Sequence, residues 1–78
     1  MRWAAMHVDS LVRMANQIGT FFEAMPDRPE ALQGIAQHLK KFWEPRMRRE
    51  LLAHIDSGAS DLSAMVAEAI RLHRDVLP

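Results

Sequence analysis

Apolar side chains recur at three- and four-residue steps along most of the chain, which is the spacing of an α-helix that buries one face. Between His7 and Met25 the polar positions fall on the opposite side of such a helix. Pro26 ends this stretch, because the residue before a proline is pushed out of the α region. The inward positions are Leu11, Met14, Ala15, Ile18, Phe21, Phe22 and Met25. The pattern therefore predicts a first amphipathic helix over residues 7–25.

A second helix is predicted to start at Asp27, which is followed three residues later by a glutamate, and to end at Pro45. Its inward positions are Leu32, Ile35, Ala36, Leu39, Phe42 and Trp43. Gly19 in the first helix and Gly34 in the second interrupt good helical sequence, where each glycine costs up to about 1 kcal/mol relative to alanine. We expect a neighbouring element to approach the backbone closely at these positions.

The third helix is predicted over residues 45–55, with Gly58 supplying the left-handed residue that follows it. The fourth begins after a cap at Asp61 or Ser63 and continues toward Val76. Their inward positions are Met47, Leu51, Leu52 and Ile55, and then Leu62, Met65, Val66, Ala69, Leu72 and Val76. On the other face of the fourth helix, Glu68, Arg71 and Asp75 are spaced to pair. Four short amphipathic helices with short connections predict an all-α compact bundle, formed as a single domain by residues 1–78.

Size and cysteine content limit what this domain can do. A single core of 78 residues rarely supplies more than roughly 3–5 kcal/mol of stability, and the chain has no cysteine to form a disulfide. The lack of cysteine also removes thiolate catalysis and iron–sulfur ligation by this chain, and fits a reducing compartment. Polar residues from Asp9 onward interrupt the apolar start too early for a signal peptide, and no apolar stretch is long enough to span a membrane. We expect a soluble, cytoplasmic protein without a membrane partner.

Charge and histidine spacing argue against several kinds of site. Ten basic and ten acidic side chains cancel, whereas a nucleic-acid binder usually carries a basic excess. The four histidines, His7, His38, His54 and His73, fall on four different predicted helices without metal-binding spacing. His7 and His73 project toward apolar faces, while His38 and His54 are boundary or surface residues. We predict no catalytic, metal or cofactor-binding residue in this chain.

The densest chemistry lies where the second predicted helix meets the third. The segment combines two aromatic side chains and a proline turn with five basic side chains, and tryptophan and arginine are enriched at binding hot spots. We predict a protein-docking site formed by Lys40, Lys41, Phe42, Trp43, Pro45, Arg46, Arg48 and Arg49. Two other interpretations remain open: an ordinary core with a solvated basic face, or a contact with phosphate or nucleic acid.

Two details of this segment are predicted from helix-start geometry. If Glu44 caps the third helix, Trp43 and Arg48 occupy the two positions of a hydrophobic staple, so the guanidinium can stack on the indole. Arg48 also lies beside the inward positions of the third helix. We therefore expect its charge to meet a carboxylate or a carbonyl group and not open water.

Two longer motifs, Arg13-Met14-Ala15-Asn16-Gln17-Ile18-Gly19 and Phe42-Trp43-Glu44-Pro45-Arg46-Met47-Arg48, resemble the delta subunit of soluble NAD-dependent formate dehydrogenase. The likeness extends over about residues 10–76 and includes Pro26-Asp27-Arg28, His38-Leu39-Lys40-Lys41 and Leu62-Ser63. Residues 1–8 are less familiar, and we expect them to form a variable, irregular N-terminal segment.

The resemblance implies a cytoplasmic complex that oxidises formate to carbon dioxide and reduces NAD. It implies a molybdenum or tungsten pterin, iron–sulfur clusters and FMN on the larger subunits, and none of these groups on this chain. It further implies a non-catalytic accessory subunit that docks on the large subunit and aids assembly, cofactor insertion or stability. The alternative function is a small helical regulator that places its basic third helix on nucleic acid. A third possibility is a homodimer in which an exposed apolar strip pairs with itself when the chain is isolated.

Overall fold

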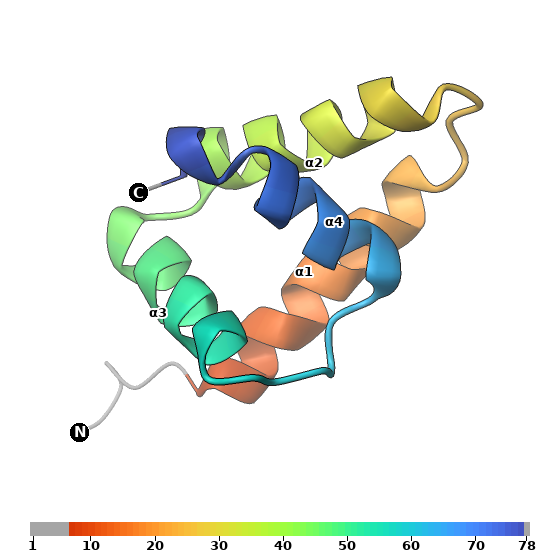
Figure 1. Ribbon diagram of the computed structural model, residues 1–78. Helices are drawn as coiled ribbons and strands as arrows, with labels where there is room; N and C mark the ends of the chain where they lie inside the picture. Colours follow the sequence, from red (N-terminus) through yellow and green to blue (C-terminus); the bar gives the residue numbers. More distant parts are fainter. Residues whose placement is uncertain (1–6, 78) are drawn as a thin grey trace.

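The chain folds as four α-helices and a terminal helical turn, seen in a computed structural model that describes residues 7–77 (Figure 1). No strand occurs in this part of the chain. Of the segment 1–8, residues 1–6 lie outside the described range, and Val8 already belongs to the first helix. The helices are α1 (Val8–Phe22), α2 (Arg28–Phe42), α3 (Pro45–Asp56) and α4 (Ala64–Leu72), followed by the 3₁₀ turn η1 (Arg74–Val76).

The helix ends follow the local signals in the sequence. The Asp27 carboxylate accepts a hydrogen bond of 3.1 Å from the Glu30 amide at the start of α2. Ser63 caps α4 by accepting from the Val66 amide at 3.3 Å, which decides between the two predicted caps. After α3, Gly58 takes a φ of +95°, the left-handed conformation expected there. The first helix ends at Phe22, three residues before its predicted end.

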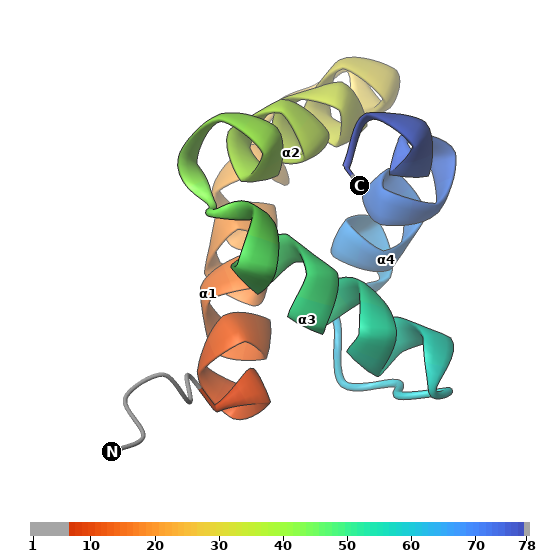
Figure 2. The same cartoon turned by 90° about the vertical axis from the view of Figure 1, so that its left-hand side faces the viewer.

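The helices pack around one core, in which α4 contacts both α1 and α2, and α3 contacts α1 (Figure 1). Figure 2 shows α3 leaving the end of α2 at a steep angle and crossing the bundle. The final turn brings Leu77 back against the region where α2 meets α3, and its side chain is buried. The largest fully buried side chains are Leu11, Ile35, Leu39, Leu51, Val66, Ile70 and Leu77.

Four predicted core residues are instead on the surface. Phe21 and Phe42 are 72% and 71% exposed, and Leu72 and Met14 are 50% and 36% exposed. On α4 the predicted inward positions Met65, Val66 and Ala69 are buried, but Ile70, which was not predicted, is buried in place of Leu72. On α1, α2 and α4 the apolar arc is wider than the area that the neighbouring helices cover, and its edge therefore remains in solvent. His7 is also exposed, contrary to the prediction.

Both helical glycines lie at close approaches, as predicted. A Cβ atom added to Gly19 would come within 2.6 Å of a Val66 methyl group on α4. A Cβ atom added to Gly34 would come within 2.4 Å of the Phe22 ring on α1. The two glycines therefore set how closely α1 packs against α4 and α2.

Candidate docking site

The basic aromatic segment predicted as a docking site forms the corner between α2 and α3. The structure divides its eight residues into two groups. Trp43 is buried in the core and Arg48 is half-buried, so neither presents its whole side chain to a partner. The other six side chains are exposed, and we call them the docking corner: Lys40, Lys41, Phe42, Pro45, Arg46 and Arg49.

Trp43 is part of the hydrophobic core. Its side chain is 5% exposed, and its amide donates to the Leu39 carbonyl at 3.1 Å, which closes the end of α2. The indole also lines a cavity of about 10 Å³ together with Leu51 and Leu77. For this residue the interpretation as ordinary core applies, because the proline turn after it folds α3 back over the end of α2.

Arg48 binds the carbonyl groups at the C-terminal end of α2. Its Nη1 atom donates to the carbonyl oxygens of Trp43 at 2.6 Å, Lys40 at 3.1 Å and Leu39 at 3.4 Å. Helix C-termini carry unsatisfied carbonyls and a partial negative charge, so a guanidinium suits this place. The prediction that its charge meets a carbonyl is confirmed. No cation–π contact with the indole is found among the described side chains, so the predicted stacking is wrong.

The docking corner combines four exposed cationic side chains with one large apolar side chain, that of Phe42. Lys40 and Lys41 occupy the last turn of α2, and Arg46 lies 3.7 Å from the Glu50 carboxylate. No ion pair in the described part of the chain includes Arg49 or either lysine. The Phe42 ring rests against the His38 imidazole, with the ring centroids 4.8 Å apart.

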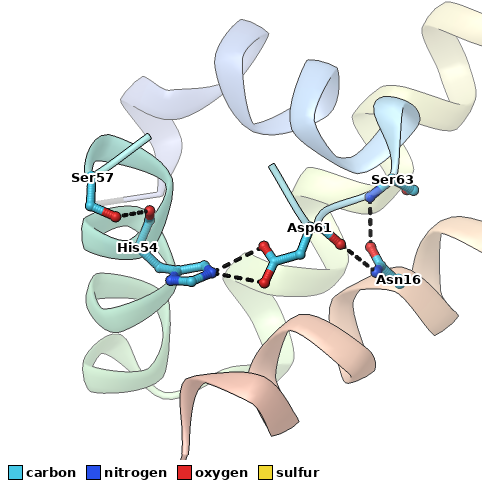
Figure 3. Close-up of polar contacts among 5 residues, drawn as sticks. All are labelled: Asn16, His54, Ser57, Asp61 and Ser63. Carbon is cyan, nitrogen blue, oxygen red and sulfur yellow. Dashed lines mark hydrogen bonds and ion pairs between the residues drawn. The ribbon is translucent and has the colours of Figure 1, made fainter. Parts of the chain in front are cut away.

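A second polar cluster, which the sequence did not predict, fastens the linker between α3 and α4 (Figure 3). The Asn16 side chain on α1 donates to the Asp61 carbonyl at 3.1 Å and accepts from the Ser63 amide at 2.8 Å. The Asp61 carboxylate in turn bonds the His54 Nε2 atom at 3.0 and 3.1 Å. Three separate parts of the chain are thereby joined, and the Ser63 cap of α4 is fixed in place.

The same cluster lacks the arrangement of a catalytic triad. Ser57 is the nearby hydroxyl, but it donates to the carbonyl oxygen of His54 at 2.6 Å and not to the imidazole (Figure 3). In the described range, no three histidine, cysteine, aspartate or glutamate side chains come together as a possible metal site. The role of the cluster is therefore structural: it holds the linker between α3 and α4 against α1.

Two ion pairs connect further elements at the surface. Arg74 of η1 donates two hydrogen bonds of 2.7 Å to the Asp56 carboxylate at the end of α3, and these bonds lower the pKa of Asp56 below its usual 3.8. Arg28 bonds Glu68 across α2 and α4 and lowers the pKa of that carboxyl below its usual 4.5. Arg71 lies 3.9 Å from Glu68, which confirms one of the predicted pairings on α4.

Comparison with known proteins agrees with the motifs. The model of a protein family described as NADH-dependent formate dehydrogenase delta subunit FdsD matches residues 10–70. This range contains both motifs that carry the resemblance, Arg13–Gly19 and Phe42–Arg48. No curated protein and no solved structure matches the chain. Within residues 7–77, no helix has the length and apolar character needed to cross a membrane.

Proposed function

The chain belongs to the NADH-dependent formate dehydrogenase delta subunit family, and on this premise we propose that it is a non-catalytic accessory subunit. It docks on the large catalytic subunit of the enzyme in the cytoplasm and aids assembly, cofactor insertion or stability. The observation that carries the docking role is the docking corner, which combines exposed cationic side chains with Phe42, a residue that is 71% exposed. Phenylalanine and arginine are among the residues enriched at protein–protein interfaces.

The polar groups of this chain support the non-catalytic part of the proposal. The His54 imidazole is bound by Asp61, and the Ser57 hydroxyl is bound by a backbone carbonyl. The cavity beside Trp43 has a volume of about 10 Å³, roughly the space that one water molecule needs, and larger hollows of about 520–550 Å³ lie open at the surface. Arg28, Glu68 and Arg74, which line these hollows, are held in the surface ion pairs described above.

The cofactors implied by the family belong on the larger subunits. The chain has no cysteine, so it offers no thiolate for an iron–sulfur cluster. The His54 and Asp61 pair supplies two metal-binding groups where a protein site ordinarily has three or four. The donor set does not fit an iron–sulfur cluster or a metal centre. We propose, as the family implies, that the molybdenum or tungsten pterin, the clusters, FMN and NAD are bound by the partner subunits.

Co-purification tests the proposed function. A tagged copy of the chain is expressed in its native host grown on formate, purified under mild conditions and analysed by mass spectrometry and by formate-dependent NAD reduction. A stoichiometric active dehydrogenase would identify a resident subunit. Recovery of only the immature large subunit would identify an assembly factor, and recovery of no dehydrogenase subunit would refute the proposal.

We propose no nucleic-acid function, since two of the three arginines on α3 are already engaged. Arg48 is held by carbonyl groups and Arg46 lies beside Glu50. Self-association of the isolated chain remains a prediction, and the exposed apolar side chains Met14, Phe21, Phe42 and Leu72 are consistent with it. Sedimentation of the isolated chain over a range of concentrations would test that prediction.

A further inference from the structure

We propose that Phe42 is the anchor of the docking corner and that it enters an apolar pocket on the partner protein whose rim carries carboxylates. This inference rests on the proposed docking function and adds the contact residue and the chemistry of the surface that receives it. Three features support it: the exposure of Phe42, the hydrogen bonds that fix its backbone, and the charges of the segment 40–50 that contains it.

The exposed apolar side chains do not have equivalent surroundings. Phe21 is exposed to the same extent as Phe42, at 72% against 71%. The Phe21 ring packs edge-on against Phe22, with the ring planes at 88°, and lies in a stretch without lysine or arginine from Gln17 to Asp27. Phe42, in contrast, follows two lysines directly and precedes the arginines of α3. Exposure is thus shared by both rings, whereas only Phe42 has basic residues close to it in the sequence.

The backbone that presents Phe42 is fixed on both sides. The next residue, Trp43, is buried, and its carbonyl oxygen accepts a hydrogen bond of 2.6 Å from Arg48. On the preceding side, the Lys40 carbonyl accepts from the same guanidinium at 3.1 Å. A side chain displayed from rigid backbone loses less conformational entropy on binding, which is a property of good anchors. Trp43 and Arg48 are therefore positioning residues for Phe42.

Charge indicates the kind of surface that receives the ring. Residues 40–50 carry five basic and two acidic side chains, while the chain as a whole is neutral. The guanidinium of Arg48 is directed at carbonyls, so Lys40, Lys41 and Arg49 are the cations that remain directed to solvent. Acidic groups on the partner would complement them, speed association and fix the register. We favour a protein over nucleic acid because Glu44 and Glu50 lie among these cations and would repel phosphates.

The matched exposure of the two phenylalanines allows a direct test. Binding of the full chain to the large subunit, purified from a strain that lacks this chain, is measured for the wild type, Phe42→Ser and Phe21→Ser. Circular dichroism confirms that each variant is folded. We expect Phe42→Ser to raise Kd about 30-fold, as a hot-spot truncation does, and Phe21→Ser to change Kd less than 3-fold. An equal effect of both substitutions, or no effect of Phe42→Ser, would overturn the assignment of the anchor.

The acidic rim is tested with the double variant Lys40→Glu/Lys41→Glu. We expect weaker binding than wild type at low salt and a smaller loss of affinity when salt is raised, because the variant has lost the favourable charge contacts. An unchanged Kd and salt dependence would overturn the acidic rim. If the wild-type chain does not bind the large subunit at all, the proposed function itself fails. If the wild-type chain binds duplex DNA instead, and Phe42→Ser weakens its binding to DNA, the partner is a nucleic acid and not a protein.

Discussion

Removing the guanidinium of Arg48 should destabilise the whole domain, because this side chain holds the end of α2 against the start of α3. The informative change is Arg48→Met, which keeps an unbranched stem for packing and removes every donor. The Nη1 atom carries two hydrogens, so the three carbonyl contacts amount to about two full hydrogen bonds. Bonds from a charged donor contribute about 1.5–3 kcal/mol each.

Two effects reduce the expected loss. The site is half-buried, so water can replace part of the lost bonding at the carbonyl oxygens. The Arg48 Nε atom is buried without a hydrogen-bond partner, and removing such a group returns about 1–3 kcal/mol. We therefore expect a net loss of about 2 kcal/mol in the free energy of unfolding. For a domain of this size that lowers Tm by about 8–16 °C.

The assay is urea unfolding followed by circular dichroism, together with a thermal melt, on the wild type and two variants. Arg49→Met is the matched control. Arg49 is adjacent to Arg48 in the sequence, is exposed, and belongs to no ion pair of the described residues. We expect the control to stay within about 0.5 kcal/mol of the wild type. Equal unfolding midpoints for Arg48→Met and Arg49→Met would mean that the carbonyl contacts do not stabilise the corner between α2 and α3.

Three further predictions concern the packing, the linker and the surface ion pairs. Gly19→Ala should lower Tm, because the added methyl group would overpack against Val66, which is stiff and fully buried. Overpacking costs about 1–3 kcal/mol, which outweighs the gain of up to about 1 kcal/mol in helix propensity. An unchanged thermal melt would contradict this prediction. Asn16→Ala removes two hydrogen bonds to the linker and should cost about 1–2 kcal/mol in urea unfolding, and a midpoint equal to wild type would show that the linker is held otherwise. Arg74 lowers the pKa of Asp56, so the stabilisation from this contact is fully present above pH 3.8 and is lost as pH falls through the lowered pKa. Between pH 5 and 2.5, Tm should therefore fall more for the wild type than for Asp56→Asn. Parallel Tm curves for the two proteins would argue against that contact.

The sequence predicted the number of helices and most of their ends, since those signals are local. Asp27 meets the amide that it caps three residues later, Pro45 opens α3, and Gly58 follows its end. In each case the residues that interact lie within one helical turn. Such local signals depend little on tertiary packing, so they could be recognised from the sequence.

The side that each helix turns inward was harder to predict. Periodicity places Phe21 and Phe42 on apolar arcs, but which edge of an arc is covered depends on how the neighbouring helices cross it. On α4 the same difficulty affects one edge of the predicted face, where Ile70 is buried and Leu72 is exposed. The spacing of apolar residues contains no information on the angle at which two helices cross. It therefore cannot predict which edge of an apolar arc is buried.

The sequence predicted which segment forms the candidate site, but not which of its side chains are exposed. The sequence located the basic aromatic corner, whereas the division between the buried Trp43 and the exposed Phe42 depends on the path of the turn at Pro45. The contact between Asn16 and Asp61 joins residues 45 positions apart, and nothing in either local sequence indicates the other. Arg48 is an intermediate case, because helix-end chemistry predicted a carbonyl partner without specifying which one.

Direct binding between purified components tests the central claim of a docking subunit. The chain is mixed with the separately expressed large subunit of the formate dehydrogenase, and the mixture is examined by size-exclusion chromatography with light scattering, beside mixtures with each of the other subunits. We predict a one-to-one complex with the large subunit and no stable complex with the others. Elution of the chain apart from every subunit, at concentrations well above a micromolar Kd, would show that it does not dock on the enzyme.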